Sequence, residues 1–279
     1  MAPRRSTASS LVSARLLVAA SHPLPCAAVS VLATALAAAS GRSPAGCGLV
    51  FGAVLSGQLS IGWSNDLVDL ARDRSAARAD KPLAVGALSP MLVRRAVLAA
   101  VALCVPLSLA SGWLAGLVHL VAVGGGWAYN LGLKRTAWSW APYAVSFALL
   151  PAFVTLGLDP PVWPDPWVWV TGALLGVGAH FLNVAPDVEA ALVAGVRGLP
   201  QRAGAVWSAA VGSVAVGTAA VVSVLGPAGP AGWWVWAGLG GTEAMSVGAL
   251  AAAVGGRGGR TAPFRLAVGA AAGAVLLLV

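Results

Sequence analysis

The sequence predicts an all-α membrane protein in which nine helices cross the bilayer. Hydrophobic residues make up 58% of the 279-residue chain and charged residues only 9%, whereas a soluble domain carries about a quarter charged residues. The mean hydropathy is +0.84. Glycine is abundant, at 35 residues, and small residues let transmembrane helices approach closely. These features exclude an ordinary soluble protein.

Apolar runs of membrane-spanning length follow one another along the chain. Their connections contain helix breakers, as in Ser43-Pro44, Asp159-Pro160-Pro161 and Gly226-Pro227. The chain therefore divides into a basic N-terminal segment, residues 1–20, which we expect to be flexible, and one transmembrane domain, residues 21–279. We expect spans near residues 24–40, 46–65, 90–110, 113–131, 138–157, 167–186, 204–225, 231–252 and 263–279.

The basic residues are segregated between the predicted loops. If the N-terminus is cytoplasmic, 16 of the 17 Lys and Arg residues lie on the cytoplasmic side and only Arg42 lies outside. This bias follows the positive-inside rule, so it explains the net charge of +8 better than nucleic-acid binding does. We expect a multi-pass protein of the cell membrane, with no nucleic-acid partner.

Four polar residues stand together at the end of the second predicted span. Asn65, Asp66, Asp69 and Asp73 form the run N-D-L-V-D-L-A-R-D. At 3.6 residues per turn, Asn65, Asp69 and Asp73 share one stripe of a helix, and Asp66 lies beside it. Carboxylates at a membrane surface are costly and mark a cation or charged-substrate site. Oxygen ligands of this kind suit a hard cation such as Mg²⁺.

A second polar stripe follows the sixth predicted span. Asn183, Asp187 and position 191 repeat the spacing of four, although position 191 is Ala. Both stripes lead into basic loops, Asp80–Gly86 and Gly195–Pro200. Two such stripes facing each other would hold Mg²⁺ against a diphosphate, because Mg²⁺ prefers a few carboxylates together with phosphate oxygens.

Lys134 lies between the fourth and fifth spans and adds a further cation for such a diphosphate. At this point the chain resembles the UbiA family of intramembrane prenyltransferases. The resemblance rests on nine helices, on N-D-x-x-D-x-x-x-D after span two, on the Tyr129-Asn130…Lys134 segment and on N-x-x-x-D after span six. The family's second motif reads D-x-x-x-D, and Ala191 replaces its second aspartate here.

The resemblance implies that Mg²⁺ bridges the carboxylates and an isoprenyl diphosphate, and that an unidentified acceptor traps the allylic cation. The prenyl tail would lie toward the lipid bilayer. We expect catalysis to depend on Asp66, Asp69, Asp73, Asp187 and Lys134. The metal ligands implied are Asn65, Asp69, Asp73, Asn183 and Asp187. The substrate contacts implied are Arg72, Lys134, Arg197, Asn130 and Tyr129, the last either through its ring face or as an interfacial anchor.

Three other functions compete with prenyl transfer. A membrane terpene cyclase would use the same diphosphate without an acceptor, and a degenerate binding protein would follow from Ala191. A cation-coupled transporter is disfavoured, because the acidic residues lie at the cytoplasmic ends of the spans and not at the bilayer midplane. Other basic residues are expected to serve topology or helix initiation: Arg74, Arg78, Arg94, Arg95 and, before Pro23, His22.

Overall fold

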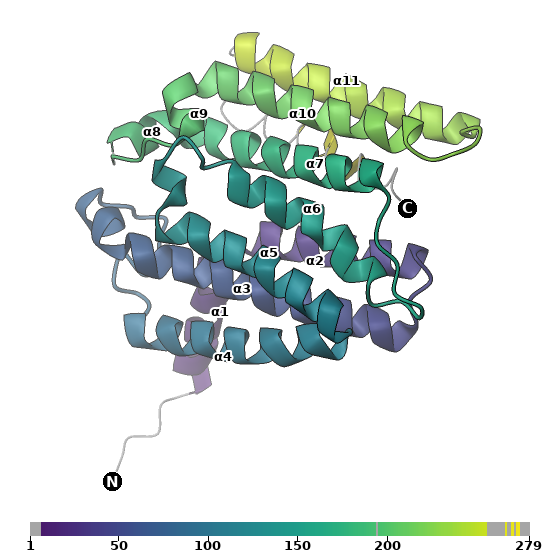
Figure 1. Cartoon of the computed structure of the whole chain (residues 1–279). Coiled ribbons are helices and arrows are strands. Elements are labelled where there is room, and N and C mark those ends of the chain that lie inside the picture. Colours follow the sequence, from purple (N-terminus) through teal and green to yellow (C-terminus); the bar gives the residue numbers. More distant parts are fainter. Residues whose placement is uncertain (1–6, 194, 256–265, 267–268, 271, 274–279) are drawn as a thin grey trace.

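The computed structural model describes residues 7–193, 195–255, 266, 269–270 and 272–273, and over these residues it is helical and contains no strand. The long helices are α2 (Pro23–Ala39), α3 (Pro44–Ser75), α4 (Pro90–Ala110), α5 (Trp113–Leu131), α6 (Ala141–Thr155), α7 (Pro166–Val184), α10 (Ala205–Leu225) and α11 (Trp233–Gly255). They run side by side through the body of the molecule (Figure 1).

Short helices fill the connections at the ends of the bundle. They are η1 (Leu133–Arg135), η2 (Ala185–Asp187), α8 (Val188–Val193) and α9 (Leu199–Ala203). Helix α3 packs on α4, α2 and α5, whereas α7 packs on α6 and α10, and α11 covers α10. The polar motif on α3 and the second stripe after α7 therefore belong to two groups of helices that α5 and α6 connect.

Proline sets the start of several helices. Pro23, Pro44, Pro90 and Pro166 occupy the first turn of α2, α3, α4 and α7, where the missing N–H costs nothing and the fixed φ suits a helix. At α3 the Ser43 side chain also accepts a hydrogen bond from the Gly46 N–H at 3.1 Å.

The predicted spans from 24–40 to 231–252 each coincide with one of these helices. Within the part of the chain that the structure describes, five helices could cross a membrane by length and composition: α3, α4, α5, α10, and α7 continued to Val193. The pair Leu11–Ala20 and Pro23–Ala39, bent by 71°, would make a sixth span, and α6 is a shorter apolar helix. The last predicted span, 263–279, lies mostly outside the described residues. Nine spans and a cytoplasmic N-terminus thus stay predictions.

Two segments beyond the predicted spans are helical. Residues 7–20, expected to be flexible, form helix α1 (Thr7–Ala20), and the Leu17 carbonyl accepts a hydrogen bond from the Trp63 indole at 2.9 Å. The second membrane span was expected to end near residue 65, and helix α3 continues beyond it to Ser75, as the predicted stripe of Asn65, Asp69 and Asp73 requires. Hydropathy marks only the end of the apolar segment. The helix continues beyond that point because its polar residues are buried against the rest of the protein.

Close contacts through glycine bring the helices together near the motif. A Cβ at Gly62 of α3 would overlap the carbonyl of Ser21, which lies in the bend between α1 and α2. A Cβ at Gly176 of α7 would overlap the carbonyl of Tyr143 on α6 in the same way. Small residues permit this approach of backbones in a membrane bundle.

Candidate active site

The helix that carries the motif ends in a tight capping turn. Ala77 has the left-handed φ of 49°. The Arg78 N–H donates to the Asp73 carbonyl at 3.0 Å and the Ala77 N–H to the Arg74 carbonyl at 3.1 Å. This is the Schellman pattern of helix ends. The turn directs the chain back toward α3, so that residues 78–81 face the carboxylates of the motif.

Asp69 lies at the centre of the first cluster. Its Oδ2 atom accepts from Lys134 Nζ at 2.6 Å and pairs with Arg72 Nη2 at 2.7 Å. Lys134 Nζ also donates to Asn65 Oδ1 at 3.0 Å. Asp69 is 2% exposed and Lys134 is 5% exposed. Burial lowers the pKa of the Lys134 ammonium, and the hydrogen bond to Asp69 opposes this shift.

Asn130 fixes the position of α5 against α3. Its amide donates to the Ile61 carbonyl and to Ser64 Oγ, both at 2.8 Å. Asn130 is 3% exposed. The side chain predicted to touch substrate is therefore engaged in a helix-to-helix contact. That contact holds the chain that leads to Lys134 beside Asp69.

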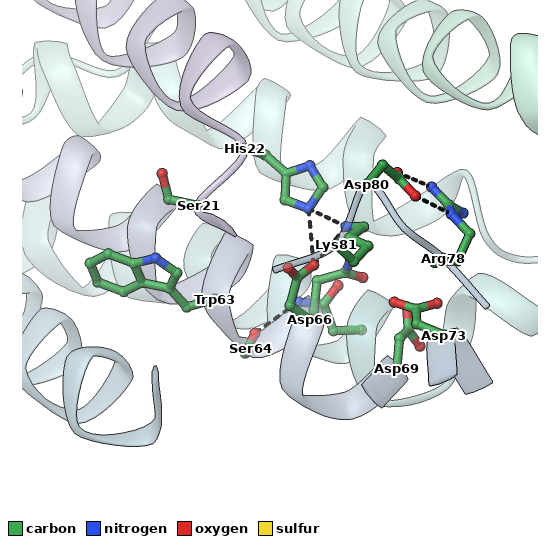
Figure 2. Close-up of polar contacts among 12 residues, drawn as sticks. Ser21, His22, Trp63, Ser64, Asp66, Asp69, Asp73, Arg78, Asp80 and Lys81 are labelled. Carbon is green, nitrogen blue, oxygen red and sulfur yellow. Dashed lines mark hydrogen bonds and ion pairs between the residues drawn. The ribbon is translucent and has the colours of Figure 1, made fainter. Parts of the chain in front are cut away.

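Asp66 points to a different set of partners, which Figure 2 shows. Its Oδ1 atom accepts from Lys81 Nζ at 2.7 Å and lies 3.3 Å from His22 Nε2. Lys81 Nζ is also 3.0 Å from His22 Nε2. His22 was expected to initiate a helix, and it does stand at the N-cap of α2 with φ 56°. It also reaches Asp66, which the sequence offered no way to foresee. Asp66 thus ties the bend before α2 to the loop after α3.

Arg78 was expected to serve topology, but it faces acidic groups from both motifs. It makes a bidentate ion pair with Asp80, with nitrogen–oxygen distances of 2.8 and 2.6 Å. The hydrogen bond to Asp80 raises the pKa of the Arg78 guanidinium, and the charges of Asp73 and Asp187 act in the same direction. The same hydrogen bond lowers the pKa of the Asp80 carboxyl to about 2. Arg78 therefore lies within electrostatic range of one carboxylate from each motif.

The second stripe does not have the predicted geometry. Helix α7 ends at Val184, and Ala185–Asp187 form a 3-10 turn that contains Pro186. Proline removes a backbone donor, so the α-helical hydrogen bonding is interrupted between Asn183 and Asp187. Both side chains are exposed. Arg197 is exposed as well, and its carbonyl accepts from Arg202 Nε at 2.8 Å.

Tyr129 lies among aromatic rings next to this site. Its ring centroid is 5.2 Å from that of Tyr143 and 5.6 Å from that of His180, both edge-to-face. Tyr129 and Tyr143 each keep part of their surface accessible. His180 is 1% exposed and had not been singled out, because a lone histidine in an apolar run carries no spacing signal.

The oxygen atoms of the first motif fit a divalent cation. Asp69 Oδ1 is buried and lacks a hydrogen-bond partner, and a buried acceptor without a partner is costly. No three His, Cys, Asp or Glu side chains among the described residues converge as a closed metal cage. An incomplete set of oxygens is what Mg²⁺ uses when phosphate completes its shell.

A model of the UbiA prenyltransferase family matches residues 24–269. The chain belongs to this family. The predicted resemblance is therefore confirmed, and UbiA membership together with the long apolar helices makes this a membrane protein. None of the curated proteins compared matches the chain.

Solved UbiA structures share the fold. A UbiA homologue from Aeropyrum pernix K1 is 19% identical with a TM-score of 0.72, over 90% of this chain and 96% of that one. A digeranylgeranylglyceryl phosphate synthase is 16% identical, with a TM-score of 0.65 and coverage of 95% and 97%. A homologue from Archaeoglobus fulgidus bound to GPP and Mg²⁺ is 14% identical, with a TM-score of 0.63 and coverage of 94% and 99%.

Proposed function

We propose that this protein is a Mg²⁺-dependent intramembrane prenyltransferase that moves an isoprenyl group from its diphosphate to a small acceptor. The observation that carries the proposal is Asp69, a buried carboxylate with two cations on one oxygen and no partner on the other. Structures of an Archaeoglobus fulgidus homologue with GPP and Mg²⁺ or with DMAPP and Mg²⁺ support it.

The residues proposed to hold Mg²⁺ are Asn65, Asp69, Asp73 and, from the second motif, Asn183 and Asp187. When bound there, Mg²⁺ would neutralise negative charge on the departing diphosphate. Lys134 and Arg72 both form ion pairs with Asp69 Oδ2.

Lys134 and Arg72 would donate to diphosphate oxygens, with Arg197 as a further contact. Arg suits such a role because its planar fork matches phosphate. Arg78, between the two carboxylate groups, joins this set. The basic residues thus serve as counter-ions for the carboxylates before substrate binds and for the diphosphate afterwards.

The aromatic rings beside the site have a separate task. Tyr129 and Tyr143 meet edge to face with their centroids 5.2 Å apart. Ring faces attract positive charge, and apolar walls exclude water from a reactive allylic cation. We therefore propose that these rings border the position of the first prenyl carbon.

The test is product analysis with protein purified into lipid nanodiscs. Isoprenyl diphosphates of several chain lengths are supplied with and without Mg²⁺ and with and without aromatic acceptors, and products are identified by mass spectrometry. We expect Mg²⁺-dependent diphosphate release coupled to a prenylated acceptor. Cyclic hydrocarbons formed without an acceptor would identify a terpene cyclase instead, and absence of any diphosphate release would refute both.

A matched pair of variants tests whether diphosphate release depends on Asp69. Asp69→Asn should abolish diphosphate release, because an amide cannot replace the carboxylate charge. Asp165→Asn is the control: Asp165 is exposed at the N-cap of α7 and makes no side-chain cap bond, so activity should persist. Equal activity in the two variants would place the metal elsewhere.

A further inference from the structure

Arg42 is the one basic residue that the charge pattern places at the outer end of the helical bundle. It lies in the connection between α2 and α3, whereas Asp69 lies near the other end of α3. The 25 residues from Pro44 to Asp69 correspond to roughly 37 Å along the helix axis, at 1.5 Å per residue. The positive-inside rule accounts for the other 16 Lys and Arg residues but does not account for Arg42.

Three connections of the bundle meet around the Arg42 side chain. They join α2 to α3, α4 to α5 and α6 to α7, and they lie at the same end of the bundle (Figure 1). Arg42 Nη2 donates to the carbonyl of Ser111, the residue after α4, at 3.5 Å. A Cβ at Gly157, just after α6, would lie 2.6 Å from Arg42 Cζ, and a Cβ at Gly46 in α3 would lie 3.1 Å from Nε. The two glycines therefore make room for the guanidinium.

The guanidinium has far fewer partners than it has donors. It presents five N–H groups, but the Ser111 carbonyl is its one hydrogen-bond acceptor among the described residues, and Nη1 is buried without a partner. None of the ion pairs within the described part of the chain includes Arg42. Burial lowers the pKa of the Arg42 guanidinium. A partly buried charge of this kind is costly until an anion approaches it.

Two hydroxyl groups on the same connections also lack partners. Ser111 Oγ and Thr155 Oγ1 are both buried without a hydrogen-bond partner, and Ser111 is 5% exposed. Ser111 is the residue whose carbonyl contacts Arg42, and Thr155 is the last residue of α6, two positions before Gly157. A phosphate group suits this set of donors, because its oxygens match the planar fork of a guanidinium and leave others for hydroxyl groups.

Exposed tryptophans indicate the depth of this site in the membrane. Trp113 begins α5, two residues after Ser111, and is 71% exposed. Trp163 follows Gly157 by six residues and is 53% exposed. Exposed tryptophans gather at the level of the lipid headgroups, so Arg42 lies where lipid phosphates are available. Because no carboxylate of the described residues pairs with Arg42, the net positive charge favours a headgroup with net negative charge.

We infer that Arg42, Ser111 and Thr155 bind the phosphate group of an anionic phospholipid at the end of the bundle opposite Asp69. The guanidinium and the two hydroxyl groups donate to the phosphate oxygens, which supplies the partners that they lack. The bound headgroup joins the three connections and thereby stabilises the ends of α3, α4 and α6. This lipid site does not depend on the proposed prenyl transfer.

Thermal unfolding of the delipidated full-length protein in a neutral maltoside detergent tests this inference. The additions are phosphatidylglycerol, phosphatidylcholine and diacylglycerol with the same acyl chains, and inorganic phosphate. We expect phosphatidylglycerol to raise the melting temperature by about 5 °C at a concentration about 100-fold above its Kd. Phosphatidylcholine should raise it less, and the other two additions should have no effect. Stabilisation by phosphatidylcholine, diacylglycerol or inorganic phosphate as large as that by phosphatidylglycerol overturns the inference.

Variants of the three donors locate the headgroup. Arg42→Gln should raise the Kd for phosphatidylglycerol roughly tenfold or more, because a hydrogen bond to a charged group is worth roughly 10- to 100-fold in affinity. The double variant Ser111→Ala with Thr155→Val removes both hydroxyl groups and should raise the Kd roughly tenfold. Without lipid, its melting temperature should be no lower than that of the wild type, because the hydroxyl groups it removes are buried and unpaired.

Arg94→Gln is the matched control for charge. Arg94 is exposed in the first turns of α4, at the other end of the bundle, so the Kd for phosphatidylglycerol should stay within about twofold. A guanidinium that only capped α4 would stabilise the protein equally in every lipid. Equal Kd values in the wild type and the double hydroxyl variant, or an equal loss in Arg94→Gln, therefore refute the lipid site even if Arg42→Gln fails to fold. The measurement needs no turnover, so its outcome is separate from that of diphosphate release.

Discussion

Replacing Lys134 with methionine tests whether Asp69 is the metal-binding carboxylate. The substitution removes the ammonium that donates to Asp69 Oδ2 at 2.6 Å and keeps most of the apolar stem. Breaking a buried ion pair by removing one partner costs about 3–5 kcal/mol. Arg72 still contacts the same oxygen at 2.7 Å, so we expect a loss of about 2 kcal/mol, roughly half of that range.

The loss should be reversible by the metal alone. A penalty of this size lowers the melting temperature by about 4–8 °C for a chain of this length. In Lys134→Met, Asp69 has lost a counter-ion, and Mg²⁺ can take its place without first displacing an ammonium. We therefore expect Mg²⁺ without diphosphate to raise the melting temperature of Lys134→Met more than that of the wild type. The assay is thermal unfolding in nanodiscs, followed by intrinsic fluorescence over a Mg²⁺ titration.

Lys81→Met is the matched control. Lys81 Nζ lies 2.7 Å from Asp66 Oδ1, and the Asp66 side chain is 1% exposed. Breaking this pair should also lower the melting temperature, but Mg²⁺ should restore little, because Asp66 faces His22 and the loop and not the stripe of Asn65, Asp69 and Asp73 that we propose to bind the metal. Equal responses to Mg²⁺ in Lys134→Met and the wild type, or a restoration just as large in Lys81→Met, would refute the assignment of Asp69.

Three further substitutions probe the frame of the site. Ala77→Gly should stabilise the protein by about 1 kcal/mol, because an L-residue is strained in the left-handed conformation; thermal unfolding measures it. Gly62→Ala should lower the melting temperature and activity, since its Cβ would overlap the Ser21 carbonyl and push the α1–α2 bend away from α3. Ala191→Asp, which adds a carboxylate to α8 one turn after Asp187, should lower the Mg²⁺ concentration needed for half-maximal diphosphate release.

Each of these has a control at a comparable position. Ala76→Gly adds flexibility at a residue with φ −87° and should not stabilise the chain. Gly48→Ala meets open space and should be tolerated. For Ala191→Asp, an identical Mg²⁺ response in Ala190→Asp would mean that position 191 does not face the metal. The strain argument fails if Ala77→Gly has no effect, and the contact argument fails if Gly62→Ala is neutral.

The helices and the first motif were predictable because their signals are local. Long apolar runs between Pro and Gly leave little alternative to membrane helices. The Asn65, Asp69 and Asp73 stripe depends only on the pitch of a helix that does continue through Ser75. The second stripe is less regular, because Pro186 lies between Asn183 and Asp187 and the α-helix gives way to a 3-10 turn there. A spacing rule holds only where the helix is unbroken.

The sequence by itself determined the class of protein, most helix boundaries, the family and the carboxylates of the candidate site, because composition and spacing are properties of neighbouring residues. Only the tertiary structure decided which partner each carboxylate takes: Lys134 and Arg72 for Asp69, but Lys81 and His22 for Asp66. These partners lie 3, 15, 44 and 65 positions away along the chain. Backbone approach at Gly62 and capping at Ala77 bring the distant ones together. The same long-range packing left one nitrogen of His180 without a partner, which no pattern in the sequence announces.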